Sequence, residues 1–151
     1  MRLRSRQRYA ATMVEFAIVG SLALLVVLGL LVGGMGVFRY VEIASLAGEC
    51  SRWASVHGRL YQQDTGIPAA AALDVYNNVI AMQAAGLKLN PADCNVTWQP
   101  SLPIGNRPYQ LVNNQVVPNT VTVTITYQWL PEAFLAGPIT LSSTSVSPME
   151  N

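Results

Sequence analysis

The feature that most constrains this chain is an uncharged run of 23 residues from Phe16 to Phe38. About 20 apolar residues in a helix cross the roughly 30 Å hydrocarbon core of a bilayer. The run is therefore long enough to form a transmembrane helix. The sequence predicts a single membrane span, with a short segment before it and most of the chain after it.

The residues before the span form a basic tail. Arg2, Arg4, Arg6 and Arg8 supply four of the nine basic residues of the chain. Lys and Arg beside a span are retained on the cytoplasmic side, so the tail predicts a cytoplasmic amino terminus and an exported part over 39–151. A nucleic-acid-binding arm is the alternative, but beside an apolar span a topology signal is the usual role of such a tail.

The charge balance of the chain beyond the basic tail argues against several classes of partner. Nine basic residues less the four of the tail leave five, against eight carboxylates. No basic patch for nucleic acid remains. With one histidine and two cysteines, no ordinary zinc set can be built. No nucleophile or acid–base set stands out, so we expect no enzyme, no cofactor and no small-molecule substrate.

Both cysteines, Cys50 and Cys94, fall in the exported part. In an oxidising compartment two such cysteines commonly pair, and we therefore predict a disulfide between them. A pair of buried free thiols is the alternative. Alkylation with and without a reductant separates the two states by mass.

The exported part predicts an α+β fold that begins with a helical stalk. Apolar side chains recur at three- and four-residue steps from Ile43 to Tyr61, as is typical of an amphipathic helix. With no proline before Pro68, we expect this helix to continue the membrane helix out of the bilayer. A second helix follows, with Pro68 in its first turn and Gly86 at its carboxy-terminal cap.

An antiparallel sheet of about three strands is expected after the helices. Residues 121–129 alternate apolar and polar side chains without a fault, which indicates a strand with one buried face. A short hairpin is expected over 111–117, inside a proline-rich loop. The predicted elements are helices over 39–62 and 68–85 and strands over about 94–99, 120–129 and 139–146.

Gly29 and Gly33 form a small-xxx-small pair within the span. Small residues at this spacing let another helix approach closely, so the pair is a candidate helix-packing site. Glycine is also common in transmembrane helices generally, and ordinary composition is the alternative explanation.

Residues 9–20 read Tyr-Ala-Ala-Thr-Met-Val-Glu-Phe-Ala-Ile-Val-Gly. This block resembles the start of the TadE-like pseudopilins of bacterial tight-adherence (Flp) pilus systems. Those begin with an Arg-rich leader, then Gly-Ala-Thr-x-Val-Glu-Phe-Ala and a long apolar helix. Residues 47–58 are similar to the family's Ala-Arg-Glu-Gly-Ala-Arg-Tyr-Ala segment, and the strand and proline turn over 121–131 give further support.

The resemblance implies a pilin-like fold and a minor pseudopilin that takes part in assembling a pilus or related secretion machine. It implies a leader over 1–10, cut between Ala10 and Ala11 by a prepilin peptidase, then a transmembrane helix over 11–38. Ala10 departs from the family pattern, because such peptidases favour Gly before the cut. The implied partners are the peptidase, other pilin or pseudopilin subunits and the assembly platform. The implied location is the bacterial cytoplasmic membrane, with the exported domain in the periplasm or in an extracellular pilus.

Glu15 lies inside an apolar region that begins at Tyr9. An ionised carboxylate there is costly unless it is paired or close to the headgroups. The resemblance assigns Glu15, beside Phe16, an assembly role in which it pairs with the ammonium of Ala11 in a neighbouring subunit. The alternative is a Glu15 that reaches back to the membrane surface and contacts Arg8.

Two other interpretations of the anchor remain open. In the first, the chain is a membrane-tethered binding module, and the span serves only for attachment. In the second, the span is a cleaved secretory signal, although the apolar region of such signals is only about 7 to 15 residues long. Deleting residues 2–10 or changing Glu15→Ala would stop a filament subunit from assembling and leave a tethered binder active.

Overall fold

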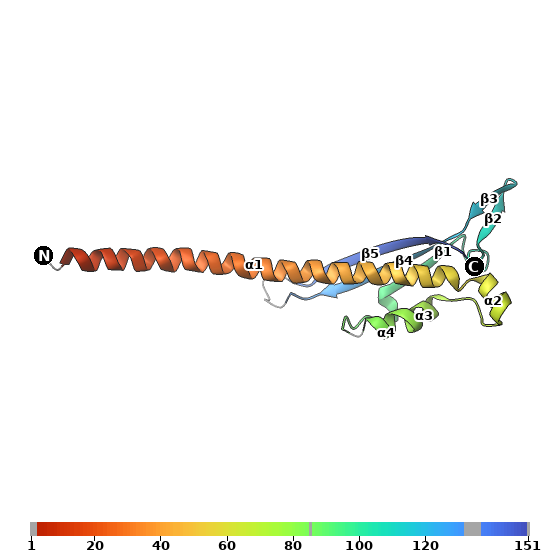
Figure 1. Cartoon of the computed structure of the whole chain (residues 1–151), viewed down its shortest axis with the longest axis horizontal. Coiled ribbons are helices and arrows are strands. Elements are labelled where there is room, and N and C mark those ends of the chain that lie inside the picture. Colours follow the sequence, from red (N-terminus) through yellow and green to blue (C-terminus); the bar gives the residue numbers. More distant parts are fainter. Residues whose placement is uncertain (1–2, 85, 132–136, 151) are drawn as a thin grey trace.

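A computed structural model describes residues 3–84, 86–131 and 137–150, and for residues 3–11 the backbone alone. One long helix, α1 (Leu3–Val56), runs the length of the molecule. A small head of short helices and strands packs along its carboxy-terminal part, while its amino-terminal part projects alone (Figure 1). The predicted α+β class is confirmed.

The long helix ends earlier than the sequence predicts. The apolar spacing predicts a helix to residue 62, but α1 ends at Val56 and α2 (Arg59–Thr65) starts after a break. Gly58 at this break has an extended backbone, with φ −86° and ψ −155°. The N–H of Arg59 donates to the carbonyl of Asn106 (2.8 Å), so a tertiary contact replaces helix continuation.

The second predicted helix starts later than expected. The N–H of Ala70 donates to the carbonyl of His57 (2.8 Å), which holds the preceding residues against the end of α1. The N–H of Ala71 then donates to the carboxylate of Asp74 (2.9 Å) and begins the helix. Pro68 therefore lies before the helix and not in its first turn.

The same helical segment is also shorter and less regular than predicted. It consists of α3 (Ala72–Val75), a π-helical turn η1 (Tyr76–Ile80) and α4 (Ala81–Gln83). The segment ends at Ala84, two residues before Gly86, so the predicted glycine cap is wrong. A π-turn widens the helix locally, and periodicity alone does not reveal it.

The main sheet has three antiparallel strands in the order β1–β4–β5. They are β1 (Cys94–Gln99), preceded by a 3₁₀ turn η2 (Pro91–Asp93), β4 (Thr120–Trp129) and β5 (Ile139–Pro148). The bounds of β1 and β4 coincide with the predicted ranges, and β5 is two residues longer. Thr124 pairs with Thr144 across the outer face, where their hydroxyls lie 2.9 Å apart.

A second sheet is the two-stranded hairpin of β2 (Tyr109–Val112) and β3 (Gln115–Pro118). Asn113 and Asn114 form its turn with φ values of 51° and 65°. Positive φ at both central residues is the requirement of a type I′ hairpin turn, and Asn tolerates it. The short hairpin expected inside the proline-rich loop is confirmed.

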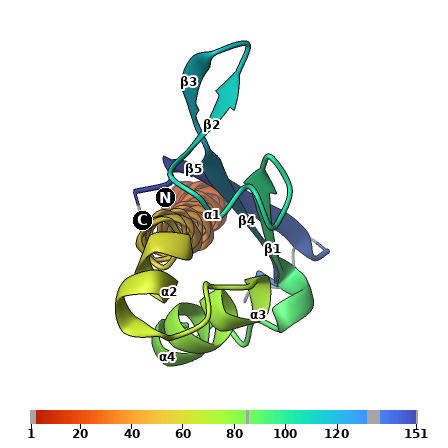
Figure 2. The same ribbon diagram turned by 90° about the vertical axis from the view of Figure 1, so that its right-hand side faces the viewer.

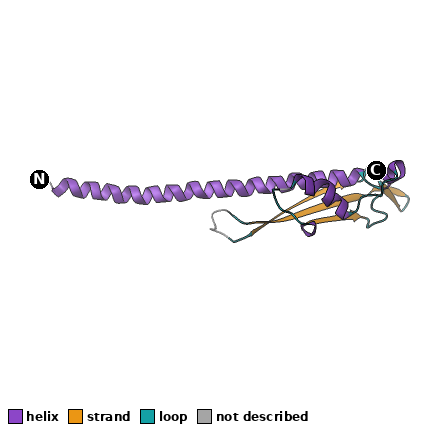
Figure 3. Cartoon of the chain, turned by 90° about the horizontal axis from the view of Figure 1, so that it is seen from below, coloured by secondary structure: helices purple, strands orange, loops and turns teal. Residues whose placement is uncertain are grey.

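The core lies between the second half of α1 and the sheet. Viewed along the helix axis, the sheet and the short helices flank α1 on different sides (Figure 2). The strands run alongside the helix (Figure 3). The buried stripe of α1 consists of Ile43, Leu46, Ala47, Cys50 and Ala54, and the facing residues of β4 are Val121, Val123 and Ile125.

Candidate functional site

The amino-terminal half of α1 is an apolar surface without a covering layer. From residue 12 to residue 35 the described side chains are exposed, apart from the half-buried Gly20 and Val32. An 18-residue window of this helix has a mean hydropathy of 2.7, and none of it is buried within the protein. The helix is long and apolar enough to cross a membrane. A signal sequence near an amino terminus has the same length and composition.

Glu15 lies near the start of this bare surface and is exposed. Phe16, next to it, keeps 78% of its surface exposed. Ala10 and Ala11 lie within α1, and their side chains fall outside the described residues. Residues four apart in a helix share a face, so the backbone of Ala11 lies one turn before Glu15, about 6 Å along the axis.

Gly29 and Gly33 are also exposed, and a methyl group added to either would meet nothing within 4 Å. The pair therefore leaves a shallow, unoccupied strip on one face of α1. Within the described chain no element covers this strip, and its predicted role in helix packing stays a prediction.

Gly36 differs from the other glycines of the span, because the head touches α1 there. An added Cβ at Gly36 would lie 2.7 Å from Cζ3 of Trp129. Trp129 ends β4 on the same face as Val121 and Ile125, and only 6% of its surface is exposed. This contact marks the point on α1 where the bare surface ends and the head begins. The sequence does not predict it, because nothing in a local pattern relates residues 93 positions apart.

A cluster of hydroxyl groups links α1 to β5. The Ser51 hydroxyl lies 2.9 Å from that of Ser145 and accepts a hydrogen bond from Ser147 (3.0 Å). It also donates to the carbonyl of Gly48 (3.0 Å). Ser51 is fully buried, so these hydroxyls satisfy one another inside the helix–sheet contact. The sequence signal for this cluster is the serine alternation in β5, which by itself indicates only an edge strand.

Both cysteines are free thiols in this structure. Cys50 is fully buried on α1, and Cys94 is half-buried at the start of β1. The pKa of Cys50 is raised to about 12, mainly by burial and also by charge repulsion from the nearby Cys94 and Glu49. Burial also raises the pKa of Cys94. Cys94 is close enough to affect the ionisation of Cys50, and the disulfide stays a prediction.

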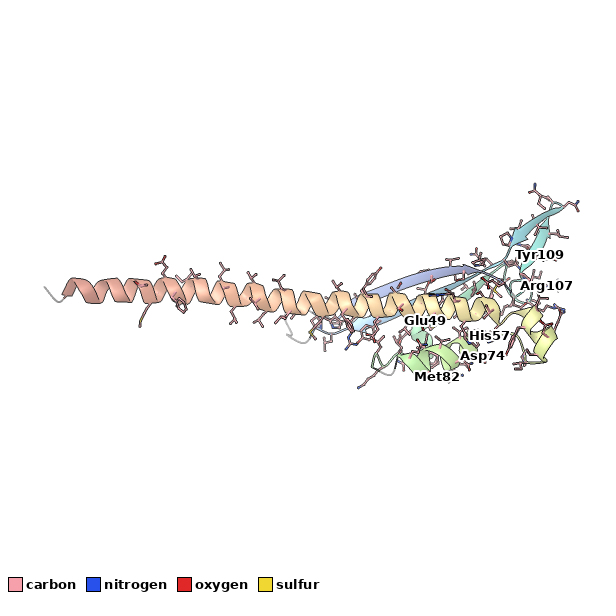
Figure 4. The ribbon with its side chains drawn as sticks, viewed as in Figure 1. Glu49, His57, Asp74, Met82, Arg107 and Tyr109 are labelled. Atoms are coloured by element: carbon pink, nitrogen blue, oxygen red, sulfur yellow. The ribbon has the colours of Figure 1, made fainter. Side chains whose placement is uncertain are left out.

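The head also carries an open depression beside the end of α1, with a volume of about 390 Å³. Trp53 and His57 stack with ring centroids 4.0 Å apart, and Tyr61 continues the row at 4.6 Å from His57. His57 Nδ1 donates to the carbonyl of Trp53 (2.8 Å), which fixes the ring. Asp74 lines the other side (Figure 4). In the described chain, no group of three His, Cys, Asp or Glu side chains is placed to hold a metal ion.

Comparison with protein-family models, curated proteins and solved structures finds no match to this chain.

Proposed function

We propose that this chain is a minor pseudopilin-like subunit that takes part in assembling a tight-adherence (Flp-type) pilus or a related secretion system. The observation that carries the proposal is an exposed carboxylate, Glu15, near the start of a bare apolar helix. Such a carboxylate is costly once packing against other apolar helices removes it from the headgroups, and a neighbouring subunit then provides a partner. The resemblance of residues 9–20 to TadE-like pseudopilins supports the same function.

In this proposal the membrane stores the subunit before assembly. The basic tail keeps the amino terminus in the cytoplasm, and the head lies outside the cytoplasmic membrane. A prepilin peptidase removes residues 1–10 and leaves a new ammonium group on Ala11. The assembly platform then moves the subunit toward the other pilins, either into the filament or to its base.

Glu15 sets the axial position of one subunit against the next. After the cut, the ammonium of Ala11 lies one helical turn below Glu15 of the same chain. A neighbour displaced by about that turn brings its own ammonium level with this carboxylate. An ion pair is stronger in an apolar surrounding than in water, so this displacement is favoured over others.

The strip at Gly29 and Gly33 provides the close approach that such packing needs. Lipid tails are as apolar as leucine, so helices in a membrane associate through tight packing and not through the hydrophobic effect. Small residues one turn apart let two backbones come near each other. The strip is open, since no described atom lies within 4 Å of the position that a methyl group would take at either glycine.

The first test is the amino-terminal residue of the protein recovered from native membranes, by intact mass or terminal sequencing. We expect a start at Ala11. A start at Met1 would leave an ordinary signal anchor and would contradict prepilin-type processing.

A second test separates assembly from simple anchoring. We expect Glu15→Ala to abolish incorporation into the assembled machine, measured by co-purification with pilin subunits, while membrane insertion persists. Glu42→Ala is the matched control, because Glu42 lies on the same helix and pairs with Arg39 at 3.0 Å. Equal incorporation of both variants would contradict the proposed role of Glu15.

The second candidate function is a membrane-tethered binding module. The depression lined by Trp53, His57, Tyr61 and Asp74 favours it, because aromatic walls with one carboxylate can hold a small ligand. In that case the Glu15→Ala variant keeps full activity, and Trp53→Ala removes it.

A further inference from the structure

The contact between Trp129 and Gly36 fixes where the head lies relative to the apolar part of α1. The inward face of β4 packs along α1: Val121 pairs with Ser147, whose hydroxyl bonds to Ser51, and Trp129 lies at Gly36. The ten residues of β4 extend about 30 Å, and the helix from Gly36 to Ser55 rises by about the same distance. A hydrogen bond near the carboxy terminus of the chain is consistent with this alignment, because the N–H of Glu150 donates to the carbonyl of Ser55 (3.1 Å).

The level of Gly36 coincides with the end of the hydrocarbon core. With Glu15 near the headgroups of one leaflet, the 20 residues from Phe16 to Met35 span about 30 Å, the thickness of the core. Gly36 is the next residue, so it enters the headgroup layer of the opposite leaflet. Trp129, in contact with Gly36, reaches the same depth.

The side chains around this end of the head suit a bilayer surface. Leu130 after β4 is 54% exposed, and Ile139 at the start of β5 is 40% exposed. Phe38 and Tyr40 on α1 are exposed at the same level. Trp129 itself is buried against α1, with only 6% of its surface exposed, so it fixes the depth of this end of the head and does not face lipid.

We propose that the end of the head where β4 stops at Trp129 and β5 begins at Ile139 (the β4–β5 end) is a second membrane contact. It is seated in the headgroup layer of the bilayer that α1 crosses. The side chains that would meet lipid are the exposed Leu130, Ile139, Phe38 and Tyr40, and the buried Trp129 marks their depth. Lipid is the occupant because this surface is continuous with the apolar surface of the span. The inference rests on the membrane span of the proposed function and not on pilus assembly.

This contact would fix the orientation of the head relative to the membrane before assembly. The β2–β3 hairpin lies at the opposite end of the head from the β4–β5 end and points away from the membrane (Figure 1). A subunit that enters a filament must therefore lift the β4–β5 end off the lipid as its helix leaves the bilayer.

The test places the full chain in phosphatidylethanolamine–phosphatidylglycerol vesicles that contain a brominated phosphatidylcholine, whose bromine atoms quench nearby tryptophan emission. One variant, W53F/W98F, keeps Trp129 alone, and the matched control, W98F/W129F, keeps Trp53 alone. With bromine near the headgroups, we expect Trp129 to lose emission and Trp53 to lose none. Equal loss in the two variants overturns the proposal.

A reporter in the span separates failure of this inference from failure of the anchor. In a chain with all three tryptophans changed to Phe, Leu25→Trp is quenched by bromine deep in the acyl chains if α1 crosses the bilayer. Quenching at Leu25→Trp without quenching at Trp129 leaves the span in place and overturns the head contact. Absence of quenching at both positions overturns the membrane span and the head contact together.

A second measurement leaves Trp98 in the core unchanged. In a Cys94→Ala background, Leu130→Cys and Leu111→Cys are labelled in turn with a polarity-sensitive fluorophore, while the buried Cys50 stays protected. Both leucines are exposed, so neither change disturbs packing. In vesicles, we expect a bluer emission from the label at Leu130 than from the label at Leu111 on the hairpin. Identical emission at the two sites overturns the proposal.

Discussion

At the residue scale, Gly36 is the position where one missing methyl group decides a tertiary contact. The other described glycines of the span, such as Gly29 and Gly34, face open space, so their size is free of constraint within this chain. At Gly36 the indole of Trp129 occupies the volume that a side chain would need. The helix therefore uses a small residue at this point for packing within the protein.

We predict that Gly36→Ala destabilises the head. The new methyl group would lie 2.7 Å from Trp129, and overpacking of this kind costs about 1–3 kcal/mol. The gain in helix propensity offsets up to about 1 kcal/mol of this. Near-UV circular dichroism during denaturation in detergent measures the change. Gly34→Ala is the control and gains propensity without a clash, so equal midpoints for the two variants would contradict the prediction.

The buried thiol of Cys50 predicts a loss of stability in alkaline solution. Its pKa is about 12 in the folded chain against an ordinary value of 9.0, so the unfolded state releases the proton first. The contribution is fully present below pH 9.0 and is lost progressively as the pH rises toward 12.

The measurement is the urea midpoint of the reduced chain at about pH 8 and about pH 10. We expect the urea midpoint to fall less between these pH values in the Cys50→Ala variant, which lacks the titrating group. The same fall in both chains would show that other groups cause it. A disulfide with Cys94 would remove the effect in the oxidised protein.

At the element scale, local patterns predict the strands better than the helices. The alternation of β4 is visible in the sequence because Val121, Val123 and Ile125 face α1 while the threonines between them face outward. The end of α1 at Val56 is not visible, because the hydrogen bond from Arg59 to Asn106 joins distant segments. The π-turn η1 escapes prediction because it leaves the apolar spacing nearly helical.

The candidate site divides in the same way. Glu15, Gly29 and Gly33 can be selected from the sequence, since a charge or small residues in an apolar run are local signals. The contact of Trp129 with Gly36 and the serine cluster at Ser51 depend on the register of β4 and β5 against α1. No single segment encodes that register.

The hydrogen bonds of Ser51 with Ser145 and Ser147 are expected to stabilise the contact between α1 and β5. Ser51→Ala leaves the half-buried hydroxyls of Ser145 and Ser147 without their shared partner, which costs about 0.5–1.5 kcal/mol. Denaturant unfolding of the detergent-solubilised chain measures the loss. Ser21→Ala is the control, because Ser21 is exposed and donates to the carbonyl of Ile18 (2.9 Å) in its own helix, and a similar loss there would refute the role of the cluster.

At the scale of the whole molecule, the chain divides into a bare helix and a helix covered by the head. The bare part has the length and composition of a membrane span, and the covered part carries the described core. The proposed processing site lies at the far end of the bare part, where Ala10 replaces the glycine usual in TadE-like pseudopilins. Changing Ala10 tests directly whether the chain is cut after this residue.

We predict that Ala10→Gly raises the fraction of the protein that starts at Ala11, because prepilin peptidases favour glycine before the cut. Intact mass of the membrane-extracted chain gives the ratio of the two forms. Ala17→Gly is a control that adds a glycine elsewhere in the helix. A start at Met1 in every variant would argue against the peptidase as a partner.

The strands of the head run alongside α1 and not across it (Figure 3). A pulling force applied between the amino-terminal half and the head therefore acts parallel to the strands. The packed side chains between α1, β4 and β5 then bear the load in shear, all at once. Separation in this direction needs many contacts to yield together, whereas peeling from one end would open them in turn. The joint between head and helix is therefore mechanically strongest along the axis of α1.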